Sequence, residues 1–329
     1  MKVLFYGVRP VEVAYFNQIN EKFGYDMVLE EAFLNEGNAD LAKGCEAVVL
    51  RANCLADKKY IDTIKEFGVK YLFTRTVAFN HIDVEYAKEQ GLKVARVPSY
   101  SPNAIGELAV SLALQLSRTA PVIANTVNKN FLVSGEYFAK EIRNSVVGVV
   151  GTGKIGLTAA KLFKGLGAKV IGYDIFQSDE AKEVLEFVSL EELQAQSDII
   201  SLHVPYFPGS NDEMVNAEFL SGMKDGSILV NTSRGEIQNH GDILNALKAG
   251  KLRGYGTDVF SKEATIFFQD FKDKEIPDPV VEELVHLYPR VLITPHIGSF
   301  TDEALMNMIE TSLENIQSHE TNGSSPNDL

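Results

Sequence analysis

The sequence predicts an α/β protein with two doubly wound, parallel-sheet domains. Short apolar strands alternate with amphipathic helical segments along the whole chain. The strands of the second half are almost continuously hydrophobic, which is typical of a parallel sheet covered on both faces. The 329 residues are enough for two cores, since a domain commonly holds about 100 to 200 residues.

The first hundred residues predict one α/β unit. Two helical segments, residues 58–68 and 83–91, each end in glycine, which commonly terminates a helix. Short β-rich runs surround them, at residues 2–8, 46–50, 69–74 and 92–97.

A second α/β series follows a dense apolar helix. Ser101 is a suitable N-cap for this helix, and Pro102 stands at its first position. A last amphipathic helix opens at Thr301, and we expect the polar tail, residues 318–329, to fray. Six buried strands are predicted at residues 145–151, 168–174, 198–204, 226–232, 252–260 and 290–296.

Composition excludes several classes of protein. The net charge of −14 argues against a nucleic-acid or anionic-membrane surface, because both need a basic patch. No apolar run could cross a bilayer, and the N-terminus lacks a signal-peptide pattern. Cys45 and Cys54 lack metal-ligand spacing, so we expect reduced thiols, no metal site and a cytoplasmic location.

A glycine motif predicts a dinucleotide site. Gly151, Gly153 and Gly156 form a G-x-G-x-x-G pattern directly after a strand, and Lys154 and Ile155 open the helix that follows. The first glycine permits a tight turn, the second lets a pyrophosphate approach the backbone, and the third permits close packing of helix and strand. The strand–glycine–helix–strand order is typical of a Rossmann-like fold.

The next strand ends in Asp174, 18 residues beyond Gly156. Its carboxylate can accept hydrogen bonds from ribose hydroxyls and would repel a 2′-phosphate. Because the sequence DIFQSDE after this strand contains no Arg or Lys, we predict NAD rather than NADP.

Three residues at strand ends of the second domain suit hydride transfer to a carbonyl. Such a reaction needs a proton donor and a cation that orients and polarises the substrate. Arg234 lies in the segment ILVNTSRG, Glu263 is the last residue of YGTDVFSKE, and His296 is the last residue of LITPH. Strand ends are where α/β folds place their chemistry.

Six ordered segments resemble the D-isomer-specific 2-hydroxyacid dehydrogenase family. They extend from about residue 70 to about residue 310, and the start MKVLFYGVR fits the branch with D-lactate, D-2-hydroxyisocaproate and (R)-2-hydroxyglutarate dehydrogenases. The segments are VPSYSPNAIGELA, VGVVGTGKIG, SDIISLHVP, MKDGSILVNTSRGE, GYGTDVF and VLITPHIGSFT.

This resemblance implies a role for each candidate. Arg234 would hold the substrate carboxylate, and His296 would donate a proton to the carbonyl oxygen as hydride arrives. Glu263 would hydrogen-bond the imidazole and raise its pKa. His203 matches a position that lines the cofactor, although it could equally be structural. Further cofactor contacts are implied for Val204, Pro205, Asn211, Thr232, Ser233 and Asp258.

Substrate contacts are expected from the first domain and its junctions. The backbone amides of Val77, Ala78 and Phe79 would hold the substrate carboxylate, and Tyr100 would contact substrate. Ala78 replaces the family's usual glycine, which is mildly unfavourable if its φ is positive. Asn239 replaces a helix-capping aspartate and should cap nearly as well. The other histidines, His81, His240, His286 and His319, are expected on the surface or in loops.

Leu50 and Ser299 stand where lactate enzymes of this branch carry bulky aromatic residues, so a wider pocket is expected. Phe79 and Phe300 could refill part of it. Arg51 lies in VVLRANC, which is similar to a stretch of (R)-2-hydroxyglutarate dehydrogenases, and it could either pair with a second carboxylate or simply face solvent.

The sequence therefore predicts an NAD-dependent D-2-hydroxyacid dehydrogenase. Residues 1–100 and 299–329 would form the substrate domain and residues 101–298 the NAD domain, with the active-site cleft between them and a homodimer through the NAD domain. The expected substrates are 2-oxo acids larger than pyruvate, 2-oxoglutarate first, then 2-oxoisocaproate or phenylpyruvate. The alternatives are a D-lactate dehydrogenase, a formate or phosphoglycerate enzyme, and a non-catalytic NAD-sensing scaffold.

Overall fold

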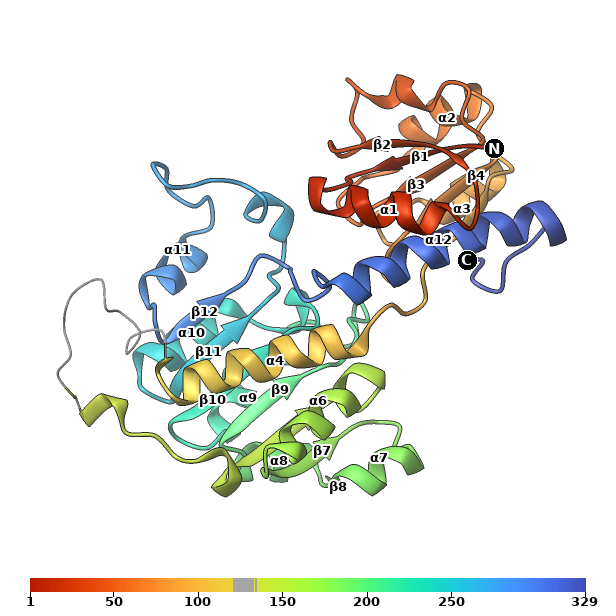
Figure 1. Cartoon of the computed structure of the whole chain (residues 1–329). Coiled ribbons are helices and arrows are strands. Elements are labelled where there is room, and N and C mark those ends of the chain that lie inside the picture. Colours follow the sequence, from red (N-terminus) through yellow and green to blue (C-terminus); the bar gives the residue numbers. More distant parts are fainter. Residues whose placement is uncertain (121–132, 134) are drawn as a thin grey trace. The chain divides into compact units, whose positions relative to one another are not determined.

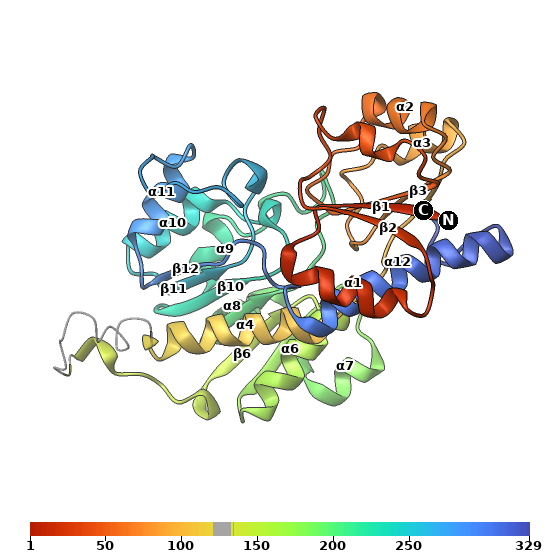
Figure 2. The same cartoon turned by 45° about the horizontal axis from the view of Figure 1, so that its top comes forward.

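The computed structural model describes residues 1–120, 133 and 135–329. The chain divides into two compact units. Unit 1 comprises Met1–Ser101 and Ser299–Leu329, and unit 2 comprises Pro102–Gly298. Each unit holds one parallel sheet with helices on both faces, so the predicted α/β fold class is confirmed (Figures 1 and 2).

The sheet of unit 1 has five strands in the order β2-β1-β3-β4-β5. One face packs on α2 and α3 through Ile61, Ile64 and Ala87. The other face packs on α1 and on α12, which is the helix that the chain contributes after leaving unit 2. The strands are β1 (Lys2–Tyr6), β2 (Asp26–Glu30), β3 (Ala47–Leu50), β4 (Tyr71–Thr74) and β5 (Lys93–Ala95), and the helices are α1 (Val13–Asn20), α2 (Lys58–Glu66), α3 (Val84–Glu89) and α12 (Asp302–Asn322).

The sheet of unit 2 has seven strands in the order β12-β11-β10-β9-β6-β7-β8. The helices α4 and α6 lie side by side on one face (Figures 1 and 2). The other face is covered by α8, α9, α10 and α11. The strands are β6 (Val146–Val150), β7 (Lys169–Tyr173), β8 (Glu186–Phe187), β9 (Ile199–Leu202), β10 (Ser227–Asn231), β11 (Leu252–Thr257) and β12 (Val291–Ile293), and the helices are α4 (Pro102–Ser117), α6 (Lys154–Gly165), α7 (Asp179–Val184), α8 (Leu190–Gln196), α9 (Ala217–Gly222), α10 (His240–Lys248) and α11 (Pro279–His286).

Two edge strands, β2 and β8, do not appear among the predicted strands. The segment Asp26–Glu30 carries an acid at each end and is only partly buried, and Glu186–Phe187 has two residues. Both strands lie at a sheet edge, where one side of the strand needs no partner and a long apolar run is not required.

The prediction of a frayed tail is wrong. The helix α12 continues to Asn322, and Gly323 caps it in the left-handed conformation at φ +74°. The last residues then run antiparallel to the end of β5, with Asp328 bridged to Ala95. The Leu329 N–H donates to the Val94 carbonyl at 2.9 Å, so the polar tail is held by backbone pairing.

Candidate active site

His296 and Glu263 meet after separate strands of unit 2. His296 follows β12, and its Nδ1 lies 2.6 Å from Oε1 of Glu263. Both side chains are partly exposed, at 37% and 26%. Because the carboxylate accepts the Nδ1 proton, Nε2 is the ring nitrogen that remains to exchange a proton with a ligand. The geometry is that of a histidine acid–base group oriented by a carboxylate.

The loops that carry Glu263 and Arg234 pack closely against each other at Gly235. A Cβ at this glycine would lie 1.9 Å from the carbonyl carbon of Phe260 and 2.2 Å from the nitrogen of Ser261. Only a residue without a side chain permits this approach. The backbone that leaves β10 therefore sets the position of the backbone that leaves β11.

Arg234 presents a cation without an acidic partner. Its Nη1 donates to the Ser233 carbonyl at 2.7 Å, and its own carbonyl accepts from the Asn231 amide group at 2.8 Å. Among the described residues no carboxylate pairs with its guanidinium. A partly buried, unneutralised guanidinium at a strand end is suited to bind a carboxylate.

Asp258 fixes the loop that carries His296. Its carboxylate accepts from the Thr294 hydroxyl at 2.6 Å and from the Ile297 and Gly298 amides at 2.8 Å each. The His296 amide also donates to the Asp258 carbonyl at 3.1 Å, which holds His296 at φ +51°. With 2% of its surface exposed, Asp258 has a raised carboxyl pKa because burial outweighs these hydrogen bonds.

The glycine loop has the shape that a dinucleotide requires. Gly151 has a φ of +87°, and a Cβ on Gly156 would lie 1.9 Å from the Gly151 carbonyl oxygen. Gly153, by contrast, faces open space, with nothing within 4 Å of a Cβ built there. The N-terminus of α6, which begins at Lys154, thus opens onto room for a pyrophosphate.

Asp174 lies beside this loop at the end of β7. Its Oδ2 accepts from the Thr152 amide at 2.5 Å and from the Thr152 hydroxyl at 3.1 Å. Its Oδ1 accepts from the Phe176 amide at 2.9 Å. The contacts hold the carboxylate next to the glycine turn, which is where an adenosine ribose lies when a pyrophosphate occupies the helix N-terminus.

The other predicted cofactor residues follow strands β9 and β10 of unit 2. A Cβ on Gly151 would lie 2.8 Å from the Val204 nitrogen, so the end of β9 packs on the glycine turn. Asn211 closes residues 205–211 into a compact loop, donating to the Pro205 carbonyl at 2.8 Å and accepting from Phe207. The hydroxyl of Thr232 is buried without a partner among the described residues, as expected of a group that hydrogen-bonds a ligand.

His203 contacts Ser201 through one ring nitrogen, and its other ring nitrogen, Nδ1, is buried without a partner among the described residues. Its Nε2 lies 2.8 Å from the Ser201 hydroxyl, and burial lowers its pKa to about 4. It contributes its backbone to the wall beside Gly151.

In unit 1, the loop after β4 presents unpaired amides. The carbonyl of Val77 accepts from Arg96 at 3.0 Å, that of Ala78 from the Thr76 hydroxyl at 2.8 Å, and that of Phe79 from the Ile82 amide at 3.0 Å. In the described part of the chain the amides of Val77, Ala78 and Phe79 donate to no acceptor. Ala78 does not have a positive φ, so alanine is compatible with this turn. Successive free amides form an anion-binding concavity.

Three arginines lie at the same edge of the unit 1 sheet. Arg75 is buried and makes two 3.0 Å hydrogen bonds with the Glu12 carboxylate and one of 2.7 Å with the Gly7 carbonyl. Arg9 lies 4.0 Å over the Phe300 ring, and its Nη1 is buried without a partner among the described residues. Burial, together with Arg9 and Arg75, lowers the pKa of Arg51 to about 9.

Comparisons with known proteins agree with this geometry. Residues 110–298 match the family described as D-isomer specific 2-hydroxyacid dehydrogenase, NAD binding domain. An aromatic 2-oxoacid reductase of Clostridium sporogenes is 39% identical over 328 residues, which is 99% of this chain and 98% of the relative. The chain belongs to the D-isomer-specific 2-hydroxyacid dehydrogenase family.

Solved structures of family members superpose over the full length. A D-lactate dehydrogenase of Treponema pallidum matches with a TM-score of 0.91 and 36% identity, covering 100% of this chain and 99% of that one. An NAD-complexed member from Lactobacillus delbrueckii ssp. bulgaricus matches with a TM-score of 0.87 and 30% identity, covering 100% of both chains. The protein is thus an NAD-dependent oxidoreductase of 2-hydroxy acids, as predicted.

The residues predicted to contact substrate differ in how exposed they are. Leu50 is fully buried in the core of unit 1, so Arg51 is the first residue after β3 with exposed surface. Phe79 and Phe300 are exposed, at 38% and 42%. The Tyr100 carbonyl accepts from Asn307 of α12 at 2.6 Å, and Ser299 lies next to Phe300 and is partly exposed.

The prediction of surface or loop positions is wrong for His319, which lies in α12, whereas His81 lies in a loop as predicted. His81 and His319 are buried, at 8% and 4% exposure. His81 bonds Thr74, and His319 pairs with Asp328 and packs on Tyr71 and Phe73. Both hydrogen-bond partners lie within ten residues in the sequence, whereas Tyr71 and Phe73 reach His319 from β4. His240 is partly buried against Phe260, and His286 is exposed as predicted.

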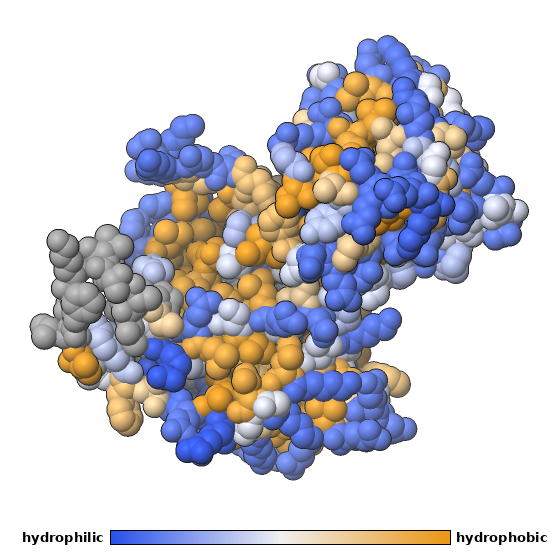
Figure 3. Space-filling model, viewed as in Figure 1, coloured by the Kyte–Doolittle hydropathy of each residue, from blue (hydrophilic) through white to orange (hydrophobic). Residues whose placement is uncertain are grey.

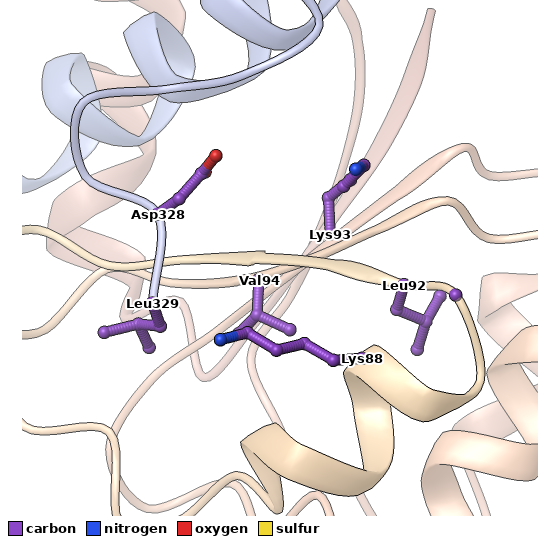
Figure 4. Close-up of a pocket in the computed structure, with 7 residues that line it drawn as sticks. Lys88, Leu92, Lys93, Val94, Asp328 and Leu329 are labelled. Atoms are coloured by element: carbon purple, nitrogen blue, oxygen red, sulfur yellow. The ribbon is translucent and has the colours of Figure 1, made fainter.

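One pocket of unit 1, of about 280 Å³, is lined by none of the predicted site residues (Figure 4). It is bordered by the α3–β5 connection, including Lys88 and Lys93, and by the C-terminal Leu329. This is the amino end of β5, whereas the loop Val77–Phe79 and Arg51 follow the carboxyl ends of their strands. No helix in the described part of the chain is long and apolar enough to span a membrane.

Proposed function

We propose that this enzyme reduces 2-oxo acids larger than pyruvate to D-2-hydroxy acids with NADH, and that 2-oxoglutarate is its leading substrate. The observation that carries the proposal is the arginine group of unit 1. Arg9, Arg51 and Arg75 follow β1, β3 and β4, and burial together with the other two guanidinium groups lowers the pKa of Arg51 to about 9. Clustered guanidinium groups favour a substrate with a second carboxylate.

Each residue of the site has a separate role in the proposed reaction. Bound NADH supplies the hydride. Arg234 binds the substrate carboxylate and polarises the 2-oxo group. In unit 1, the amides of Val77, Ala78 and Phe79 are suited to donate hydrogen bonds to a carboxylate. His296 donates a proton from Nε2 to the carbonyl oxygen, and Glu263 stabilises the charged ring while that proton is in place.

A distal carboxylate has two available partners. Arg75 makes its hydrogen bonds with Glu12 and Gly7, so we assign the contact with a distal carboxylate to Arg9 and Arg51. The unpartnered Nη1 of Arg9 and the lowered pKa of Arg51 both indicate guanidinium groups that an anion would stabilise. Pyruvate has no second carboxylate and would therefore make no distal ionic contact with these guanidinium groups.

An aromatic 2-oxo acid is the second candidate. The relative at 39% identity is named an aromatic 2-oxoacid reductase, and the exposed rings of Phe79 and Phe300 could stack on such a side chain. Relatives named D-lactate dehydrogenases keep pyruvate as an alternative. A non-catalytic NAD sensor is disfavoured, because it would not need the paired His296 and Glu263.

A steady-state panel decides among these candidates. NADH oxidation should be followed with 2-oxoglutarate, 2-oxoisocaproate, phenylpyruvate and pyruvate, with chiral analysis of the product. We expect the highest kcat/KM with 2-oxoglutarate and a product of D configuration. A clear preference for phenylpyruvate or pyruvate would remove the dicarboxylate assignment, and no turnover with any of the four would remove the enzymatic proposal.

The same proposal includes a homodimer through unit 2 and a cytoplasmic location. Figure 3 shows apolar patches on the surface of unit 2, and Phe138 is 86% exposed. Such surface favours a protein partner, and a second copy is the simplest one. Cys45 and Cys54 are buried free thiols, which fits a reducing compartment. Sedimentation equilibrium of the purified chain would distinguish one copy from two.

A further inference from the structure

Arg96 contacts the free-amide loop at two points. Its Nη1 donates to the Val77 carbonyl at 3.0 Å, and its guanidinium lies 5.2 Å from the centre of the Phe79 ring. The two contacts flank Ala78. Because the Val77 carbonyl points toward Arg96, the Ala78 amide of the same trans peptide points away from Arg96.

The backbone of Arg96 is itself clamped from both sides. Its N–H donates to the Asn327 carbonyl at 3.1 Å, and its carbonyl accepts from the Asn315 amide group at 3.0 Å. Asn315 belongs to α12 and is buried at 1% exposure. Its Oδ1 accepts from Ser325 and from Asn327, at 2.8 Å each. The C-terminal tail and α12 therefore set where Arg96 stands.

The guanidinium of Arg96 also carries charge toward the loop. Within the residues described it pairs with no carboxylate, since its recorded contacts are Val77 and Phe79. A cation behind a row of free amides strengthens their attraction for an anion. Arg96 thus acts on a bound carboxylate through the loop and not by touching the reacting atoms.

We propose that Arg96 is a positioning residue for the substrate carboxylate, and that residues 325–329 hold it in place as a strap. This inference rests on the proposed function, in which the loop binds a 2-oxo acid. An unpaired polar tail would fray. This tail instead pairs with β5 and forms buried hydrogen bonds, which agrees with a role as a strap.

The test compares Arg96→Met with Arg96→Lys and with a matched arginine of unit 2. Arg290 likewise donates to backbone carbonyls, those of Leu247 and Leu252, but touches no residue of the loop. For Arg96→Met we expect KM for the 2-oxo acid to rise roughly 10-fold while kcat changes much less, because an interaction made before and during the reaction is lost. Arg96→Lys should recover part of the loss.

A second variant guards against a folding defect. Ser325→Ala with Asn327→Ala loosens the strap without removing the cation, and should raise KM in the same direction by a smaller factor. The dissociation constant for NADH and the melting temperature serve as controls, and the former should stay unchanged.

The outcomes separate the two proposals. If the wild type reduces no 2-oxo acid, the proposed function fails and this inference fails with it. If the wild type is active and Arg96→Met keeps a normal KM, or if Arg290→Met raises KM equally, the positioning role of Arg96 is overturned while the proposed function stands.

Discussion

The imidazole of His296 and the carboxylate of Glu263 lie 2.6 Å apart although 33 residues separate them in the chain. The pair exists because β11 and β12 are neighbours in the sheet and end at the same edge. Asp258 adds the hydrogen bonds that hold the histidine loop against the end of β11.

His296→Ala should lower kcat by about 10² to 10⁴, the usual contribution of a general acid. The dissociation constant for NADH should stay near that of the wild type, because the glycine loop and Asp174 are untouched. Single-turnover kinetics and NADH fluorescence titration measure the two effects. The exposed His286→Ala is the control, and near-normal turnover of His296→Ala would take His296 out of the mechanism.

Asp174→Ala should narrow the preference for NADH over NADPH. The Asp174 carboxylate lies against Thr152 of the glycine turn, where it would repel a 2′-phosphate. We expect kcat/KM with NADPH to rise relative to that with NADH. The nearby Asp179→Ala, which removes an exposed carboxylate paired with Lys182, should leave the ratio unchanged. A wild type that uses both cofactors equally would contradict the assignment.

Arg51→Leu should separate the candidate substrates. Loss of a charge-assisted pair costs about 1.5 to 3 kcal/mol, so kcat/KM for 2-oxoglutarate should fall roughly 10- to 150-fold. Activity on 2-oxoisocaproate should be kept or improved. Lys58→Leu removes an exposed cation of the same unit and serves as the matched control. Equal losses on both substrates would indicate a structural role for Arg51.

Glu12→Gln should destabilise unit 1 by about 3 to 5 kcal/mol, because it leaves the buried charge of Arg75 without its partner. The double variant Glu12→Leu with Arg75→Met should recover much of this loss. Urea unfolding of Glu12→Leu, Arg75→Met and the double variant gives the coupling energy. Additive effects in this cycle would mean that the pair contributes little to the fold.

Stability should fall below about pH 6.5, in part through His81. Burial lowers its pKa in the folded chain to about 4, from an ordinary value of 6.5. The unfolded state therefore binds more protons between these values, and stability is lost as the pH falls through this window and is constant above it. The contribution is up to roughly 3 kcal/mol. His81→Gln should flatten the dependence of the urea midpoint on pH between 4 and 6.5, and an unchanged slope would exclude His81 as a cause.

The sequence by itself was sufficient for those features that a short stretch of chain encodes. The glycine motif, the alternation of buried strands and helices, and the cap at Asn239, whose side chain accepts from the Asp242 amide, all depend on neighbours within a few residues. Their physical determinants are steric freedom at glycine, hydrophobic periodicity and local hydrogen bonds, and each can be read without a fold. The family resemblance added the roles of Arg234, Glu263 and His296.

Tertiary structure decided which distant groups meet. Three arrangements join segments that are far apart in the chain. They are the pairing of Arg75 with Glu12, the packing of His319 on Tyr71 and Phe73, and the strap that holds Arg96. Nothing in the composition of residues 318–329 indicates that they pair with β5, because a polar tail frays unless a partner satisfies its backbone. That partner, the open edge of β5, exists only after the five strands of unit 1 have taken their order in the sheet.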